Sequence, residues 1–208
     1  MKEHLVFDIE TIPQDSSKLT DKQKDVISDK IDRSDYWKED MKKEMALNPW
    51  FGKVVSIGIY YPERDEAYHI TGKDEAEILS KFWDDIRPFM GTFVSFNGLN
   101  FDVPFIKTRS MIHDIKPTNE RFLETRRFQS YPHFDVAQHI SDWDYRYRVS
   151  LDLACDQMGI PSPKKGEVEA STVYDAYKAG KLELIGEYCV KDLKATFELY
   201  EKVRRYRA

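Results

Sequence analysis

Two carboxylic acids, one residue apart and directly after an apolar run, constrain this chain more than any other feature. The segment reads Leu5-Val6-Phe7-Asp8-Ile9-Glu10-Thr11. Alternate residues of a strand share a face, so Asp8 and Glu10 converge while Phe7 and Ile9 point into a core. Neighbouring carboxylates repel, and without a cation at least one tends to stay protonated. The pattern predicts half of a divalent metal site or, more simply, a strand that ends in an acidic turn.

Length and composition indicate a single globular domain. The chain has 208 residues, of which 41% are hydrophobic and 33% charged, which excludes disordered and membrane-embedded classes. The longest apolar runs, such as Lys53 to Tyr61, are too short to span a bilayer, and Met1-Lys2-Glu3-His4 does not begin a secretion signal. We therefore expect a cytoplasmic protein with no membrane contact. Cys155 and Cys189 are too few for a disulfide framework and are expected to pack as thiols.

The formal charge of −5 argues against a protein that coats duplex DNA through a basic surface. It does not exclude a nuclease. Two bound divalent ions would add about four positive charges at the site, so the charge of the metal-free chain understates the positive field that a substrate meets. Basic residues do gather in short segments, such as Arg121 to Arg127, Arg146 to Arg148 and Lys164-Lys165. Such runs usually face solvent.

Strand and helix signals are interleaved along the chain. Strands are predicted at Leu5–Phe7 and onward through the acidic pair, and at Val54–Tyr60, Ala67–Ile70, Thr92–Phe96 and His133–Val136. Helices are predicted from the cap at Asp74 to Pro88, and at Val103–Ile112, Leu151–Met158, Ser171–Lys178 and Leu182–Tyr206. A charged segment at about 14–48 reads as a helical insertion. The order indicates an α/β fold, a mixed sheet flanked by helices.

A second acidic element follows the strand at Thr92–Phe96. The segment Asn97-Gly98-Leu99-Asn100-Phe101-Asp102 delivers a carboxylate at the carboxyl end of a strand, where a helix starts. Open α/β sheets bind ligands at this place. The alternative is that Asp102 simply caps the helix that follows it.

A third element lies in the last predicted helix. Tyr188 and Asp192 are four residues apart and share one face, so both can reach one site. The series Leu182, Ile185, Cys189, Thr196, Leu199 and Val203 can pack on the sheet at the same time. The alternative is an ordinary amphipathic helix whose Asp192 meets solvent.

The three elements together resemble the motifs of the DEDD superfamily of 3′→5′ exonucleases, and the resemblance spans nearly the whole chain. The matching acids are Asp8, Glu10, Asp102 and Asp192. Glu187, not histidine, precedes Asp192 by five residues, so the late motif is similar to that of the branch with tyrosine. The segments Phe7 to Thr11 and Asn97 to Asp102 are most similar to the motifs of the proofreading exonuclease of family B DNA polymerases and its small stand-alone bacterial relatives. This resemblance implies an RNase H-like fold and one exonuclease domain over residues 1–208. The charged insertion at about 14–48 departs from the family pattern.

The resemblance also implies a two-metal mechanism with Mg²⁺ or Mn²⁺. Asp8 is expected to bridge two ions, Glu10 and Asp192 to hold the ion that activates water, and Asp102 to bind the other through water. Tyr188 is expected to orient the attacking water, since a phenol with a pKa near 10 is a poor base alone. The product is a nucleoside monophosphate from a 3′ end.

Substrate contacts are less constrained. Thr11 and Asn97 are candidates for the terminal nucleotide, and Phe101 for base stacking, although Phe101 fits a core position equally well. Lys164-Lys165 fits a phosphate contact or a solvated turn. Single-stranded DNA is the expected substrate. Two alternatives stay open, namely an exonuclease that trims RNA and a nucleic-acid-binding module that has lost turnover.

Overall fold

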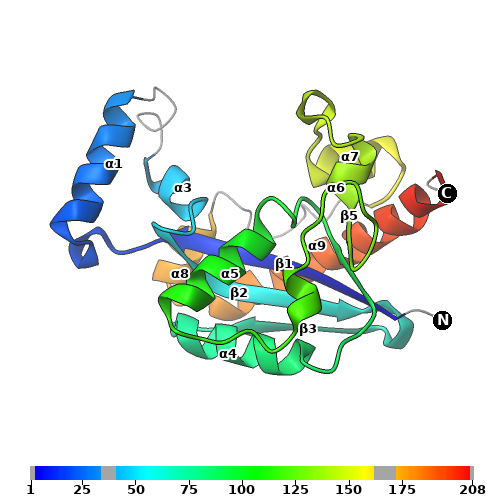
Figure 1. Cartoon of the computed structure of the whole chain (residues 1–208), viewed down its shortest axis with the longest axis horizontal. Coiled ribbons are helices and arrows are strands. Elements are labelled where there is room, and N and C mark those ends of the chain that lie inside the picture. Colours follow the sequence, from blue (N-terminus) through cyan, green and yellow to red (C-terminus); the bar gives the residue numbers. More distant parts are fainter. Residues whose placement is uncertain (1–2, 34–40, 162–171, 207–208) are drawn as a thin grey trace.

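The computed structural model describes residues 3–33, 41–161 and 172–206, and a five-stranded mixed sheet lies at its centre (Figure 1). The strands are β1 (His4–Pro13), β2 (Gly52–Tyr61), β3 (Glu66–Thr71), β4 (Thr92–Ser95) and β5 (His133–Asp135). Their order is β3-β2-β1-β4-β5. The first three strands pair antiparallel, whereas β4 and β5 run parallel to β1. This confirms the predicted α/β fold with a mixed sheet and makes β1 its central strand.

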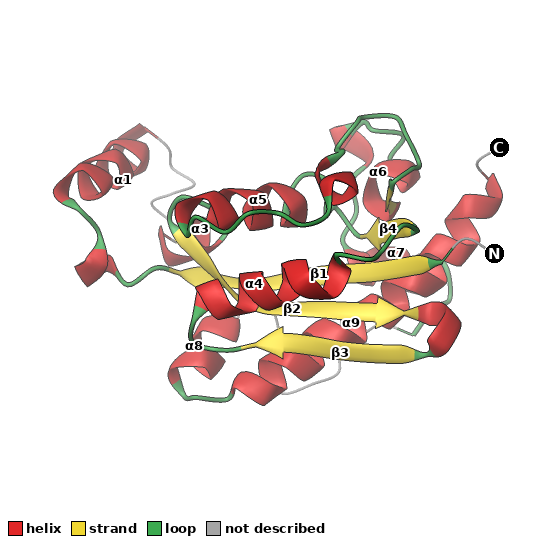
Figure 2. Cartoon of the chain, turned by 60° about the horizontal axis from the view of Figure 1, so that its bottom comes forward, coloured by secondary structure: helices red, strands yellow, loops and turns green. Residues whose placement is uncertain are grey.

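Helices cover both faces of the sheet (Figure 2). One face carries α4 (Glu75–Ile86) and α5 (Asp102–Ile112). The other face carries α6 (Val136–Ile140), α7 (Leu151–Gln157), α8 (Val173–Lys178) and α9 (Leu182–Val203). The described residues also form five short 3-10 turns, at Ser16–Lys18, Pro62–Arg64, Glu120–Leu123, Tyr145–Tyr147 and Arg204–Tyr206.

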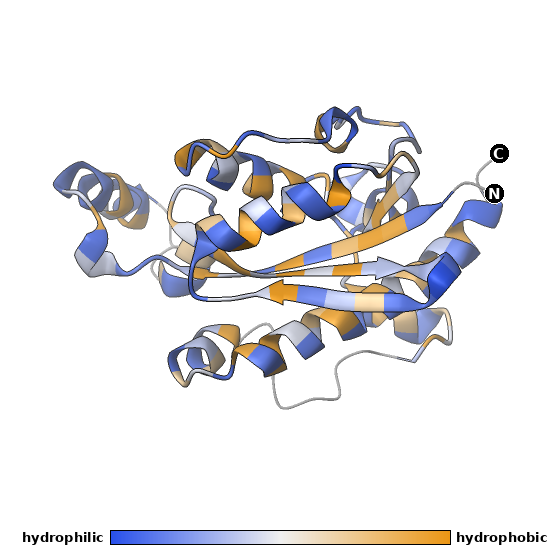
Figure 3. Ribbon diagram, turned by 90° about the horizontal axis from the view of Figure 1, so that it is seen from below, coloured by the Kyte–Doolittle hydropathy of each residue, from blue (hydrophilic) through white to orange (hydrophobic). Residues whose placement is uncertain are grey.

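The alternation of β1 decides which side chains meet which helices. Leu5, Phe7 and Ile9 are buried in the core beneath α4 and α5, as predicted for the two residues that flank the acids. Val6 lies in the core beneath α9. Figure 3 shows the sheet between the two helical layers, with apolar stretches along its strands. Because side chains alternate, the acidic pair lies on the α9 side.

The predicted element bounds agree with the structure to within a few residues, with one instructive difference. Val136, expected in the fifth strand, is the first residue of α6, because the Asp135 side chain caps that helix by accepting a hydrogen bond from the Gln138 backbone N–H at 3.2 Å. Asp74 caps α4 as predicted. The expected start of α8 at Ser171 falls outside the described residues.

The segment predicted as a helical insertion contains α1 (Asp21–Arg33) and α3 (Met41–Ala46). Its apolar contacts are few: Leu19, Ile27 and Met45 form a small cluster with Phe51, next to the start of β2. The described part of α1 is otherwise exposed or half-buried, and it projects from the sheet in Figure 1. Among the described residues, no helix is long and apolar enough to cross a membrane.

Candidate active site

The Asp8 and Glu10 side chains lie on the α9 face of β1, beside Cys189 of α9. One carboxylate oxygen from each acid and the Cys189 sulfur lie within 4.8 Å of one another. Glu10 is only 8% exposed, and Asp8 is half-buried. The sulfur also lies 3.8 Å from Asp8 Oδ2 and 3.5 Å from the Asp8 carbonyl oxygen. Two acids and a thiol therefore share one small, largely buried space.

Asp102 reaches this space because the pairing of β1 with β4 stops early. The parallel register runs from His4 opposite Thr92 only to Val6 opposite Val94. Beyond that point the Ile9 backbone N–H donates to Asp102 Oδ1 at 3.0 Å. Phe101 occupies the N-cap position of α5 and Asp102 begins the helix, so the carboxylate bonds β1 rather than capping its own helix.

Asp192 of α9 lies near enough to both acids for its charge to raise their pKa values. Its charge raises the pKa of Glu10 more than any other charged neighbour does, whereas Asp102 is the strongest charged neighbour of Asp8. Asp8 is influenced by Asp102, Glu10 and Asp192 in that order. The charges of Asp102, Glu10 and Asp192 therefore all act on Asp8.

Burial is the main reason that these acids hold protons tightly. It raises the pKa of Asp8 and of Glu10 well above the ordinary carboxyl value, and the neighbouring carboxylates add to the effect. Burial also raises the pKa of Asp102 to about 7, although hydrogen bonds from backbone N–H groups, including that of Ile9, oppose the shift. Without a cation, the cluster is a crowded set of partly protonated acids.

Gly58 allows α9 to come this close. It lies opposite Asp8 on β2, and a Cβ atom there would be 2.8 Å from the Cys189 sulfur and 3.0 Å from Leu193 Cδ1. Both distances are too short for an ordinary side-chain contact. The absence of a side chain at Gly58 therefore lets Cys189 lie directly over Asp8, with Asp192 one turn further along α9.

Comparisons with known proteins identify the family to which the chain belongs. Residues 47–208 match the family described as "Predicted 3'-5' exonuclease related to the exonuclease domain of PolB". The chain belongs to this family. An uncharacterized protein of Methanocaldococcus jannaschii is 28% identical over 168 residues, and the match covers 75% of this exonuclease-family chain and 88% of that protein.

Two further relatives are polymerases. The catalytic polypeptide of DNA polymerase epsilon is 32% identical over 137 residues in Kluyveromyces lactis and 33% identical over 138 residues in Saccharomyces cerevisiae. Each match covers 62% of this PolB-related chain but only 6% of the polymerase. The structure of the family B DNA polymerase from Pyrobaculum calidifontis superposes with a TM-score of 0.65 at 16% identity, over 98% of this chain and 24% of that one. The fold is therefore that of the PolB exonuclease domain, which is RNase H-like.

The donor set of this PolB-related domain fits hard divalent cations. Carboxylate oxygens are the ligands that Mg²⁺ prefers, and Mn²⁺ shares this preference. A bound cation would also displace the protons that burial and mutual repulsion hold on Asp8, Glu10 and Asp102. Asp8, Glu10, Asp102 and Asp192 are the residues that could hold such ions.

Tyr188 lies one turn before Asp192 on α9 and is 8% exposed. Its ring belongs to the apolar cluster that includes Ile12 of β1 and Ile185 of α9. The structure thus places it on the same side of the sheet as Glu10, next to the carboxyl end of β1.

The three residues predicted to contact substrate have other partners in this structure. Thr11 Oγ1 donates to the Ala46 carbonyl at 2.8 Å and so connects β1 to α3. Asn97 Oδ1 accepts a hydrogen bond from Asn100 Nδ2 at 3.0 Å. Phe101 is half-buried and packs against Phe105, with the ring centroids 5.4 Å apart. The candidate phosphate contact Lys164-Lys165 lies outside the described residues.

Asp135 has a structural role beside the site. Its carboxylate is fully buried and accepts hydrogen bonds from the backbone N–H groups of Asn97 at 2.8 Å and Leu99 at 3.0 Å. It therefore fixes the turn that leads to Asp102. The contributions of Gly58 and Cys189 to the site were not predicted from the sequence, although Cys189 precedes Asp192 by three residues and thus shares its helix face.

Proposed function

We propose that this chain is a metal-dependent 3′→5′ exonuclease that removes nucleoside monophosphates from the 3′ end of single-stranded DNA. The observation that carries the proposal is the meeting of four carboxylates from β1, α5 and α9, in which Asp102, Glu10 and Asp192 each raise the pKa of Asp8. Membership of a family named for the exonuclease domain of PolB supports the reaction class. A buried all-carboxylate cluster suits an enzyme that loads divalent ions to act on phosphodiesters.

In this proposal Asp8 would contact both of two Mg²⁺ or Mn²⁺ ions, Glu10 and Asp192 would hold one, and Asp102 would support the other. When bound, the ions supply Lewis-acid stabilisation of the charge that develops on the phosphate oxygens. Tyr188 orients the attacking water through its hydroxyl group. Thr11, Asn97 and Phe101 border the terminal nucleotide, Phe101 through the exposed part of its ring.

The test is digestion of a single-stranded DNA oligonucleotide labelled at its 5′ end, with Mg²⁺ or Mn²⁺ and with EDTA. We expect a ladder that shortens from the 3′ end, release of nucleoside monophosphates, and no reaction in EDTA. Asp8→Asn should lower the rate by about 100-fold or more, since the group acts directly on the charged transition state. Asp21→Asn removes a carboxylate that is 99% exposed on α1 and should leave the rate unchanged.

A matched RNA oligonucleotide separates the substrate classes. Faster digestion of RNA would replace DNA by RNA in the proposal, because the two substrates differ at the 2′-hydroxyl. Binding of either strand without any digestion in Mn²⁺, by protein that is shown to be folded, would contradict an exonuclease and indicate a binding module.

A further inference from the structure

A cavity of about 820 Å³ lies at the carboxyl end of β1, lined by residues of β1, β2, α4, α5 and α8. It is basic in a molecule of formal charge −5: five lysine and arginine side chains line it against three acids. The five are Lys18, Lys53, Lys73, Arg109 and Lys178. We call this cavity the lysine cleft. Its volume falls in the range of typical ligand sites, about 300–1,000 Å³.

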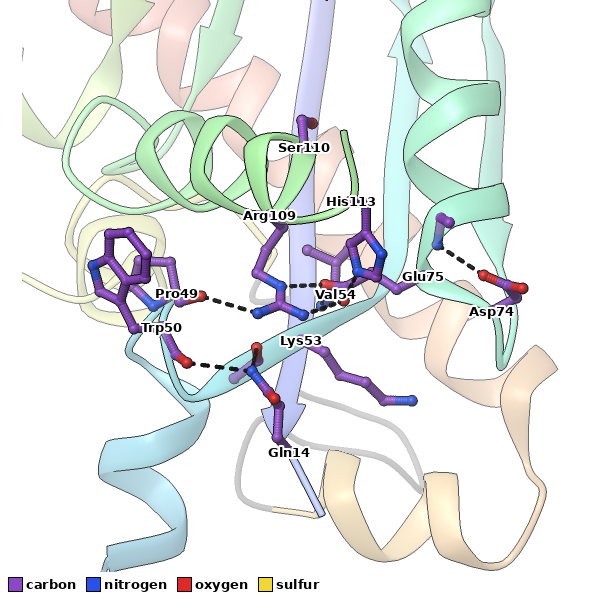
Figure 4. Close-up of polar contacts among 12 residues, drawn as sticks. Gln14, Pro49, Trp50, Lys53, Val54, Asp74, Glu75, Arg109, Ser110 and His113 are labelled. Carbon is purple, nitrogen blue, oxygen red and sulfur yellow. Dashed lines mark hydrogen bonds and ion pairs between the residues drawn. The ribbon is translucent and has the colours of Figure 1, made fainter. Parts of the chain in front are cut away.

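The three acids of the lysine cleft already have protein partners. Glu75 is 6% exposed and bonds Arg109 twice, at 2.9 and 2.6 Å, as well as His113 and the Val54 backbone N–H, as Figure 4 shows. Asp74 caps α4, and Asp15 accepts from the Ser17 backbone N–H at 2.9 Å. The acids thus hold the walls of the cleft together, and among the described residues Arg109 is the basic side chain of the cleft that forms an ion pair with one of them.

The four lysines have no carboxylate partner within the described ranges of the chain. Lys53 Nζ bonds the Tyr177 hydroxyl at 2.7 Å and lies 4.5 Å from the centroid of that ring, and Lys178 Nζ lies 5.3 Å from the centroid of Tyr174. Lys18, Lys73 and Lys178 are exposed, whereas Lys53 is half-buried. Tyrosine rings therefore position two of the ammonium groups, and among the described residues none of the four lysines forms an ion pair, although hydrogen bonds from Ser17 and, to a smaller extent, the charge of Lys18 lower the pKa of Asp15.

The lysine cleft adjoins the acid cluster. Ile12 lines the cleft and belongs to the same apolar cluster as Tyr188, on the α9 side of the sheet. It follows Glu10 by two residues, which in a strand is about 7 Å. Ile12 also pairs with Lys53 across β1 and β2. A DNA strand whose 3′ end lies at Asp8 and Glu10 can thus reach the lysines of the cleft within a short distance.

We propose that the lysine cleft binds backbone phosphates of the strand that is being digested. This inference rests on the proposed function. A cluster of carboxylates repels a polyanion, and the lysines beside it supply the opposite field at short range. Lysine ammonium groups and tyrosine hydroxyl groups bind phosphate regardless of the nucleotide sequence. The cleft therefore suits a nuclease that accepts a nucleic-acid strand of any sequence.

The experiment measures binding of a fluorescent 20-nucleotide single strand in EDTA, where digestion cannot proceed. The variant Lys18→Gln, Lys73→Gln, Lys178→Gln changes three exposed lysines, and Lys53 is left in place because it bonds Tyr177. If each lysine contacts one phosphate, the slope of log K against log salt should fall by about 2, and affinity at 0.1 M salt by about 100-fold. The control variant Lys24→Gln, Lys81→Gln, Lys116→Gln removes equal charge from exposed positions outside the cleft and should bind like the original protein.

A second substrate separates this inference from the proposed function. Thymidine 5′-p-nitrophenyl phosphate carries no backbone beyond its reacting phosphate, so with Mn²⁺ the original protein and the cleft variant should hydrolyse it equally. Unchanged strand binding in the cleft variant would overturn the cleft proposal, whether or not the ester is hydrolysed. The cleft proposal would also be overturned if the variant bound only thymidine 5′-monophosphate more weakly and the DNA strand as before. That result would assign the cleft to the released nucleotide. Reduced strand binding with no hydrolysis of the ester or of DNA would support the cleft and contradict the exonuclease.

Discussion

At the scale of single residues, Asp102 combines two roles that are usually separate. It accepts the Ile9 backbone N–H, a donor left without a strand partner where β4 diverges from β1. It also adds negative charge next to Asp8. A neutral amide could fill the first role but not the second, so the two can be distinguished by substitution.

The pH dependence of stability should reveal the charge of Asp102. Its pKa is about 7 in the folded chain and about 3.9 in an unfolded one. Because the folded chain holds this proton more tightly, protonated Asp102 contributes to stability. The contribution is fully present below about pH 4 and is lost as the pH rises through 7. In EDTA, the melting temperature should therefore fall between pH 5 and 8, and fall less in Asp102→Asn. Melting curves at one-unit steps provide the measurement, and parallel pH profiles for the two proteins would contradict the assignment.

Several of these residues could be recognised from sequence, and the reasons are physical. Strand and helix periodicities place Asp8 with Glu10, and Tyr188 with Asp192, on one face each, and the resemblance to the DEDD exonucleases joined these residues with Asp102. Gly58 did not stand out, since a glycine's role as a place of close approach depends on what lies above it. Contacts such as Thr11 to Ala46 depend on the packing of α3, which the sequence pattern does not determine.

At the scale of elements, the docking of α9 on β2 is the contact that brings Cys189 and Asp192 to β1. Gly58→Ala should push α9 outward, since the new methyl group would meet the Cys189 sulfur at 2.8 Å. We expect a loss of about 1–3 kcal/mol in the free energy of unfolding, as for other overpacked cores, and a loss of nuclease rate. Urea unfolding gives the first quantity and oligonucleotide digestion the second.

Gly72→Ala is the matched control for that substitution. Its new methyl group would lie 3.7 Å from Ile78 Cγ1, an ordinary contact distance. Adding Cys189→Ala to Gly58→Ala removes the obstructing sulfur and should restore part of the lost stability. Equal losses in Gly58→Ala and Gly72→Ala would show that the approach of α9 does not depend on Gly58.

Element positions were predictable where one signal dominated. The apolar spacing of α4 and α9 and the cap at Asp74 fixed those helices. The strand at His133–Asp135 is short, and the sequence alone did not show that Asp135 would begin a helix by capping it. The meeting of four lysines from different elements in one cleft depends on tertiary structure, so no local pattern could reveal it.

At the scale of the whole molecule, metal binding by the acid cluster, under the proposed function, would be coupled to folding. Divalent ions that bind only the folded chain should raise its melting temperature with concentration. The free energy of unfolding should increase by about 2.7 kcal/mol at a hundredfold excess over the dissociation constant. Asp8→Asn should abolish most of this rise, and Asp21→Asn should keep it. A thermal melt with graded Mn²⁺ measures the effect. A melting temperature that does not respond to millimolar Mn²⁺ would contradict an ion site at these acids.

The central position of β1 has a consequence for how the protein is made in a cell. Asp8 leaves the ribosome well before its partner Asp192 of α9, which is translated 184 residues later. A nascent chain that has not yet produced α9 lacks both the cover over β1 and one quarter of the acids. Under the proposed function, the cluster can therefore cleave nucleic acid only after α9 has been synthesised, and unfinished chains should not degrade nearby nucleic acid.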